Sequence, residues 1–160
     1  MAVSPPPVTA FSRRTLLAAS AAGLAVLVTG CTSSSAGGQE KVTPEQADRL
    51  VEQVSVQGKL VAAYAAAGAT DPALKAAVAE MAAQAQEQLD RLVAAAPGSS
   101  ASASQGWAAP VDSDPKRWLR QQVTEAATSH ATACVSQTGA RAALLGSIAA
   151  GLRGHAARLA

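Results

Sequence analysis

The sequence has few aromatic residues, few charges and little cysteine. Aromatic residues make up 2% and charged residues 15% of the 160-residue chain, which contains two cysteines. A β-sandwich or β-barrel would be richer in aromatic and β-branched residues. The lysines and arginines are not clustered, which argues against a nucleic-acid-binding protein. No nucleophile elbow, P-loop, Rossmann fingerprint or zinc-protease motif is present, so we expect neither an enzyme nor a bound cofactor.

Alanine is the most abundant residue, with 41 of the 160 positions. It has the highest intrinsic helix propensity of all residues. The composition therefore predicts an all-α protein.

Residues 1–30 are predicted to be an export signal. An apolar stretch runs from Leu16 to Val28. At about thirteen residues it is shorter than the roughly 20 that a membrane-spanning helix needs. Arg13 and Arg14 precede this stretch and, with the leucines that follow, resemble the signal of the twin-arginine translocation pathway. The alternative is an ordinary secretory signal that carries two adjacent arginines.

The end of this signal, Val28-Thr29-Gly30-Cys31, resembles a bacterial lipobox. In such a motif the cysteine thiol receives a diacylglyceryl group, and a peptidase then cleaves after the small residue, here Gly30. The new amino group can be acylated, for instance with palmitate. Each buried CH₂ group contributes about 0.8 kcal/mol, so two or three acyl chains give stable anchoring. We therefore expect Cys31 to hold the protein in the membrane lipid, on the extracytoplasmic face of the cell membrane.

Removal of the signal would leave a chain with balanced charge. The sequence has 13 Lys plus Arg and 11 Asp plus Glu, and the excess of two is Arg13 and Arg14. The isoelectric point near 8.8 is thus a property of the precursor and indicates no affinity for acidic partners. Cys134 would be the only cysteine left besides Cys31, so no disulfide can form within the lipidated chain. Its alanine-rich neighbourhood indicates a buried, small apolar residue.

Three helix-start signals divide the rest of the chain. Thr43-Pro44, Asp71-Pro72 and Asp114-Pro115 each place a capping residue before a proline at the first helical position. Gln46 completes a capping box at the first of these. Residues 31–42, rich in Ser and Gly, are predicted to be a flexible tether. The starts, together with stops at Gly68-Ala69-Thr70, Pro97-Gly98 and Gly139, predict helices over 44–67, 72–95, 115–138 and 140–159.

Apolar residues recur at spacings of three and four in each of these stretches, as in amphipathic helices. The predicted buried stripe of the first helix consists of Ala47, Leu50, Val51, Val54, Val61 and Ala65. That of the second helix consists of Leu74, Val78, Met81, Ala85, Leu89 and Leu92. His130 and His155 lie on the stripes of the third and fourth helices. A long connection, 96–113, separates the second helix from the third, and we expect Trp107 and Trp118 to hold it on the bundle. This order predicts an antiparallel four-helix bundle over 43–160 with one long crossover connection.

The order of the helices, the long connection, and the stretch from Ala142 to Ala150 that leads to His155 resemble the ferritin-like domains of actinobacterial lipoproteins. The resemblance covers about 43–160 and implies a ferritin-like bundle. It does not by itself imply a function.

Most of the ligands of a di-iron centre are missing. Di-iron ferritin-like proteins use a Glu from each of two helices and a Glu-x-x-His from each of the other two. Here Leu152 stands where that Glu would precede His155, and 72–95 contains no histidine. Glu125 and His155 are the candidates that remain, and two residues cannot hold two irons. We therefore predict no metal site.

Two weak metal-ligand candidates remain. Glu125 and His155 lie at similar distances from the turn at Gly139, so an antiparallel pair would bring them to one level. A histidine on an apolar stripe, such as His155, is more often a hydrogen-bonded core residue than a metal ligand. Glu125 fits a solvated position on the helix surface as well as it fits a structural pair with His155. His130 and Cys134, four residues apart, are the other candidate pair, for a soft metal.

Two function classes follow from these observations. We favour a non-catalytic, lipid-anchored helical domain that acts as an interaction or accessory module with an unidentified protein partner. The alternative is a ferritin-like metal-binding or redox protein with a partial site, because the twin-arginine pathway often carries folded, cofactor-loaded proteins.

Overall fold

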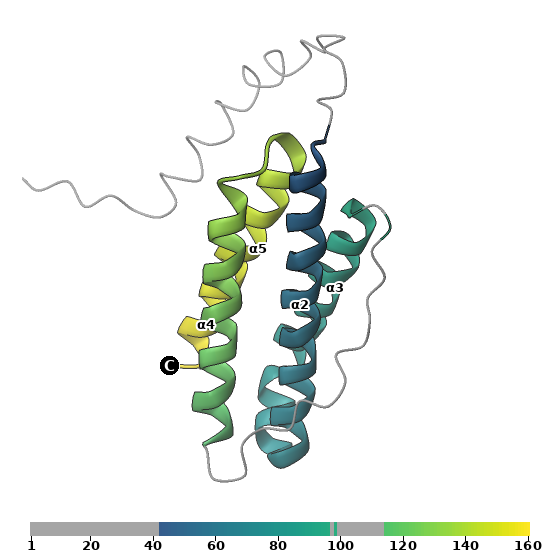
Figure 1. Cartoon of the computed structure of the whole chain (residues 1–160). Coiled ribbons are helices and arrows are strands. Elements are labelled where there is room, and N and C mark those ends of the chain that lie inside the picture. The colour runs from purple at the N-terminus through teal and green to yellow at the C-terminus, as the bar shows by residue number, and fades with distance from the viewer. Residues whose placement is uncertain (1–41, 97, 99–113) are drawn as a thin grey trace, which may run out of the picture. The chain divides into compact units, whose positions relative to one another are not determined.

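The structure, a computed structural model, describes residues 42–96, 98 and 114–160. These residues form four helices and no strand: α2 (Pro44–Thr70), α3 (Pro72–Ala95), α4 (Pro115–Cys134) and α5 (Gly139–Arg158) (Figure 1). The prediction of an all-helical bundle is confirmed. The predicted export signal and lipobox, with Arg13, Arg14, Val28, Thr29, Gly30 and Cys31, lie outside the described residues, as do Trp107 and all of the predicted tether except Val42.

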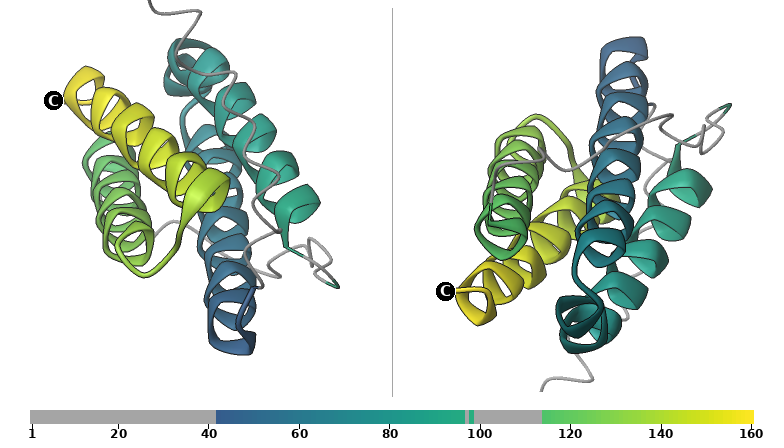
Figure 2. Two further views of the ribbon diagram at one scale, coloured as in Figure 1. Left: turned by 90° about the horizontal axis from the view of Figure 1, so that it is seen from above. Right: turned by 90° about the horizontal axis from the view of Figure 1, so that it is seen from below.

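The helices form two neighbouring pairs, α2 beside α3 and α4 beside α5, as the views from above and below show (Figure 2). The two pairs meet mainly along α2 and α4. Residues 42–160 make one compact unit that contains the whole described core. Within the described part of the chain, no helix combines the length and the apolar character that crossing a bilayer requires.

All three predicted helix starts are confirmed. The Thr43 hydroxyl accepts a hydrogen bond from the Gln46 backbone N–H, and the Gln46 side chain accepts one from the Thr43 N–H. The carboxylate of Asp71 accepts two backbone N–H groups at the start of α3, at 2.9 and 3.0 Å. The carboxylate of Asp114 does the same at the start of α4, at 2.9 and 3.3 Å. Each cap satisfies N–H groups that the first helical turn leaves without partners.

The first helix ends inside the predicted stop, Gly68-Ala69-Thr70, but three residues beyond the predicted end at 67. The helix continues to Thr70, and Asp71 alone ends α2 and begins α3. Gly68 is buried where the two helices come together, and a Cβ there would lie 3.0 Å from Cγ of Lys75. The glycine is needed for this close approach of the helices, not for a turn.

The predicted end of the third helix is also wrong. α4 ends at Cys134, four residues before position 138. The chain then turns, and the Gln137 side chain donates a hydrogen bond to the Gln46 carbonyl oxygen at 2.8 Å, which attaches the turn to α2. Gly139, with φ +56°, opens α5 instead of ending α4. A left-handed backbone conformation of this kind favours glycine.

The predicted buried stripe of α3 is confirmed at every position: Leu74, Val78, Met81, Ala85, Leu89 and Leu92. The stripe of α2 is partly wrong. Leu50 and Val54 are buried, but Val51 is 41% exposed and Ala65 is exposed. The buried face of α2 is rotated toward polar residues, because these find hydrogen-bond partners inside the bundle.

Candidate functional site

The interior of the bundle contains buried polar side chains from several helices. Those in the described residues are Gln53, Gln57, His130, Gln137 and His155. None of them is a carboxylate. Burying a polar group costs folding free energy unless the group is hydrogen-bonded. The hydrogen-bond partners of these side chains therefore indicate their role in the bundle.

The first cluster surrounds His155 and joins three helices. The Tyr64 hydroxyl of α2 lies 3.0 Å from His155 Nδ1, and Gln84 Oε1 of α3 lies 2.9 Å from His155 Nε2. The rings of Tyr64 and His155 meet edge to face, with centroids 6.4 Å apart. His155 therefore has a hydrogen-bond partner at each ring nitrogen.

The hydrogen bond between Gln84 and Glu80 determines which atoms of this cluster donate and which accept. Gln84 Nε2 donates to the Glu80 carboxylate at 3.3 Å, so Gln84 presents its carbonyl oxygen to His155. A carbonyl oxygen only accepts, so His155 carries its proton on Nε2. Its Nδ1 then accepts from the Tyr64 hydroxyl. The chain of donors runs from the buried phenol to the exposed carboxylate of Glu80, which also pairs with Arg158 at 3.7 Å.

The second cluster is centred on Gln57 of α2, which is fully buried. Its Nε2 donates to the carbonyl oxygen of Ala85 at 2.8 Å and to Gln88 Oε1 at 3.2 Å. Its Oε1 lies 2.9 Å from His130 Nε2, so His130 donates from Nε2. The Nδ1 atom of His130 is buried without a hydrogen-bond partner in the described residues.

Burial keeps these groups uncharged at neutral pH. Desolvation lowers the pKa of His130 to about 4. Burial also lowers the pKa of His155, with a further lowering from Arg158 and an opposing effect of Glu80. It raises the pKa of the Tyr64 hydroxyl far above its ordinary value, against a smaller effect of Arg158. Neutral imidazoles and amides in fixed orientations therefore link the helices of the bundle.

The structure gives Glu125 and His155 separate partners. Glu125 is exposed and accepts a hydrogen bond from Gln121 Nε2 at 2.9 Å, on the outside of α4. His130 and Cys134 are likewise separate, because the half-buried thiol of Cys134 donates to the Ala142 carbonyl oxygen at 3.2 Å. The predicted burial of Cys134 is therefore only partial.

The donor set does not fit the di-iron centre of metal-binding ferritin-like proteins. Across the described ranges, no three residues among His, Cys, Asp and Glu come together closely enough to share a metal ion. The two buried imidazoles belong to different clusters, and amides stand where carboxylate ligands would be needed. Carboxylates supply most of the ligands in ferritin-like di-metal sites.

Sequence analysis placed both histidines inside the bundle but missed Tyr64 and the role of Gln84. A signal for them exists. Tyr64 follows Gln57 by seven residues, and Gln84 precedes Gln88 by four. Such spacings put each pair on one helical face, where two polar residues on a face that also carries the core indicate bonded partners.

Comparisons with protein-family models, with curated proteins and with solved structures found no match for this chain.

Proposed function

We propose that this protein is a lipoprotein held by acylated Cys31 on the extracytoplasmic face of the cell membrane. Its helical domain then acts as a non-catalytic interaction or accessory module. The proposal includes a ferritin-like, antiparallel arrangement of the four helices, with 96–113 as the crossover connection. The sequence of the N-terminal 31 residues supports the anchor, and the interior of the bundle supports the absence of catalysis.

One observation carries the second part of the proposal. The buried polar groups of the bundle use one another as partners, from Tyr64 through His155 to Gln84, and from His130 through Gln57 to Gln88. A site that binds a substrate or a metal pair needs polar groups that are free to contact that ligand. Here almost every buried donor and acceptor is already used for linking helices. The outer surface of the bundle is then the part that is available for contact with other molecules.

Fatty-acid labelling in the producing cell tests the anchor. We expect labelled palmitate on the wild-type chain, which fractionates with membranes, and no label on Cys31→Ala. The Cys134→Ala variant is the matched control and should keep the label, since Cys134 lies in the helical domain. Label on the Cys31→Ala variant would contradict the lipobox assignment.

A second experiment tests the export route. Replacement of Arg13 and Arg14 by lysine keeps the positive charge that a general secretory signal needs, but removes the arginine pair. We expect precursor to accumulate inside the cell. Normal export of this variant would show that the twin-arginine assignment is wrong.

The metal-binding alternative has one observation in its favour, the unpartnered Nδ1 of His130. A single imidazole nitrogen can bind a transition metal only weakly unless further ligands join it. Metal titration distinguishes the two functions and is among the predictions in the Discussion.

A further inference from the structure

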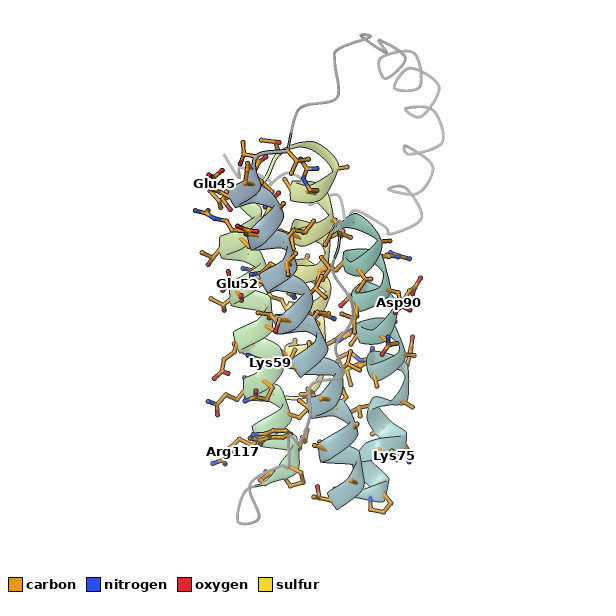
Figure 3. All side chains as sticks on the ribbon, turned by 45° about the vertical axis from the view of Figure 1, so that its right-hand side comes forward. Glu45, Glu52, Lys59, Lys75, Asp90 and Arg117 are labelled. Atoms are coloured by element: carbon orange, nitrogen blue, oxygen red, sulfur yellow. The ribbon has the colours of Figure 1, made fainter. Side chains whose placement is uncertain are left out.

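The two pairs of helices differ in net charge. Residues 114–160, which contain α4 and α5, have six Lys and Arg against two Asp and Glu, a net side-chain charge of +4. Residues 42–96, which contain α2 and α3, have four Lys and Arg against seven Asp and Glu, a net charge of −3. Arg117 projects from α4 on one side of the bundle, and Lys75 and Asp90 lie on α3 at the other (Figure 3). The balanced charge of the chain without its predicted signal therefore conceals a basic half and an acidic half.

Two shallow hollows follow one another along the exposed side of α4, and arginines line both. Arg117, Arg120 and Thr124 belong to the first hollow. The second begins one turn further along the helix, at Thr128, and Arg153 of α5 also lines it. In the described residues, none of these three arginines takes part in an ion pair. We call this surface, the two hollows on the exposed side of α4, the α4 face.

Two other charged residues line the α4 face. Glu125 lines the first hollow, where it accepts a hydrogen bond from Gln121. Arg49 of α2 lines the second, but Glu45 and Glu52 lie about one helical turn before and after it and offset its charge. When Glu125 is counted against the three unpaired arginines, α4 and α5 give this face an excess of two positive charges.

The uncharged side chains of the α4 face fit the surface of a lipid bilayer. Val135, directly after α4, is 87% exposed and lines the second hollow together with Ala131. The hydroxyls of Thr128 and Thr132 donate to carbonyl oxygens one turn earlier in the helix, at 2.9 and 3.0 Å, so these donors are already used. A guanidinium group binds a phosphate through paired hydrogen bonds, and apolar side chains beside it enter the headgroup region of a bilayer.

The predicted tether is long enough to let this face reach the membrane. The eleven residues 32–42 span at most about 40 Å when extended. The bond from Gln137 to the Gln46 carbonyl oxygen keeps the turn between α4 and α5 at the start of α2, where the tether joins the domain. Val135 lies two residues before Gln137, so one end of the α4 face is close to this junction. A short flexible linker gives an effective concentration of about millimolar, at which weak attraction is sufficient.

We infer that the α4 face docks on the anionic phospholipid surface of the membrane. This inference rests on the proposed anchor, which places the domain beside a bilayer. The lipid phosphates are complementary to the unpaired arginines of the α4 face. The same surface repels the α2–α3 half, with its net charge of −3, and so orients that half away from the membrane.

A chain that is tethered to vesicles without acylation tests this docking. A hexahistidine tag replaces residues 1–31 and binds a nickel-chelating lipid, so that the tether and the domain are complete. A fluorophore is attached at Thr128→Cys on the α4 face or, as the matched probe, at Gln86→Cys, an exposed position of α3. Both probes are placed in the Cys134→Ala background. Lipids with a nitroxide on the headgroup quench a fluorophore that lies close to the bilayer surface.

The lipid composition and the salt concentration decide the outcome. In vesicles of about 40% phosphatidylglycerol in phosphatidylcholine, at about 0.05 M salt, we expect strong quenching of the α4 probe and little of the α3 probe. In phosphatidylcholine alone the two probes should be quenched alike, because that surface has no net charge. At about 0.5 M salt the difference between the probes should also disappear, since salt screens exposed charges.

A pair of charge reversals tests the arginines. Arg120→Glu with Arg153→Glu should lower the equilibrium constant for docking about 25-fold or more, because each Arg near an anionic surface contributes about a factor of five. The matched control, Lys75→Glu with Arg91→Glu, makes the same change in net charge on α3 and should keep the difference between the probes. Circular dichroism of every variant verifies that the helices are intact.

Several results would overturn the inference. Equal quenching of the two probes on anionic vesicles would do so, as would a loss of docking in the α3 variant as large as in the arginine variant. An absence of quenching at both sites would also overturn it and would favour an acidic protein as the partner of the α4 face. Because the tag replaces Cys31, none of these results depends on acylation. Failure of the anchor in the labelling experiment and failure of docking are therefore separate outcomes.

Discussion

The hydroxyl of Tyr64 donates a hydrogen bond of 3.0 Å to Nδ1 of His155, across 91 positions of sequence. This bond joins α2, the first described helix, to α5, the last. Its direction is fixed by Gln84, which accepts from the other nitrogen of the same ring. The three side chains therefore act as one unit, and removing His155 leaves both the Tyr64 hydroxyl and the Gln84 carbonyl oxygen without this partner.

Tyr64→Phe should destabilise the domain by about 1–3 kcal/mol, because Nδ1 of His155 would be left buried without its donor. Urea unfolding followed by circular dichroism measures this cost. In a double-mutant cycle, Tyr64→Phe should cost much less when His155 is already replaced by leucine. Equal costs in the two backgrounds would show that the hydrogen bond contributes nothing.

Two glycines within helices should respond in opposite ways to replacement by alanine. Gly154 of α5 is exposed and has no atom within 4 Å of the added Cβ, so Gly154→Ala should stabilise the domain. The expected gain is up to about 1 kcal/mol, from helix propensity. Gly68→Ala should lose that gain or reverse it, since its Cβ would lie 3.0 Å from Cγ and 3.1 Å from Cβ of Lys75. Thermal unfolding of both variants measures the difference, and a similar stabilisation at both sites would contradict the close approach of α2 and α3.

His130 should make stability depend on pH. Its pKa is about 4 in the folded domain and about 6.5 when unfolded, so the unfolded chain binds the extra proton first as pH falls. The stability that neutral His130 contributes is fully present above pH 6.5. The free energy of unfolding should then fall by about 3 kcal/mol in all as the pH falls toward 4. Protonated Nδ1 would be a buried donor with no partner among the described residues.

Urea unfolding of wild type and of His130→Leu at several pH values tests this. The variant should be less stable at neutral pH, because Gln57 loses a partner, but its stability should fall less steeply between pH 6.5 and 4. His155 titrates in the same direction in both proteins, so the comparison isolates His130. Parallel curves for the two proteins would show that His130 is not responsible.

Excess Fe²⁺ or Mn²⁺ should leave the melting temperature of the domain unchanged. A ligand that binds the folded state stabilises it by RT ln(1 + [L]/Kd), so a real site would show a rise with added metal. His155→Ala should cost on the order of 1–3 kcal/mol, and equally with and without metal. Stoichiometric metal in the wild type that is lost in His155→Ala would reject the interaction module and favour the redox alternative.

Part of this structure could be predicted from interactions between residues that are close together in the sequence. Thr43, Asp71 and Asp114 act through backbone groups two or three residues away, so the sequence alone located each helix start. The stripe of α3 was predictable because its buried residues are apolar. The stripe of α2 was not, since Gln53 and Gln57 are buried by virtue of partners on α3 and α4.

The candidate site shows the same limit. A histidine on an apolar stripe predicts burial, and both His130 and His155 are buried. Which residue each one contacts depends on how three helices are rotated and shifted against each other. Periodicity within one helix carries no such information, so Tyr64 and Gln84 became visible as partners only in the assembled bundle.

The hydrogen bonds that cross between the α2–α3 pair and the α4–α5 pair also bear on how the chain reaches its final arrangement. Asp71 alone joins α2 to α3, so each pair can associate locally before the two meet. An alanine-rich apolar seam would tolerate sliding by one helical turn, about 5 Å. That displacement would break the bonds from Gln57 to His130 and from Tyr64 to His155, and leave four buried polar groups unsatisfied. The polar interior thus selects a single register for the docking of the two halves.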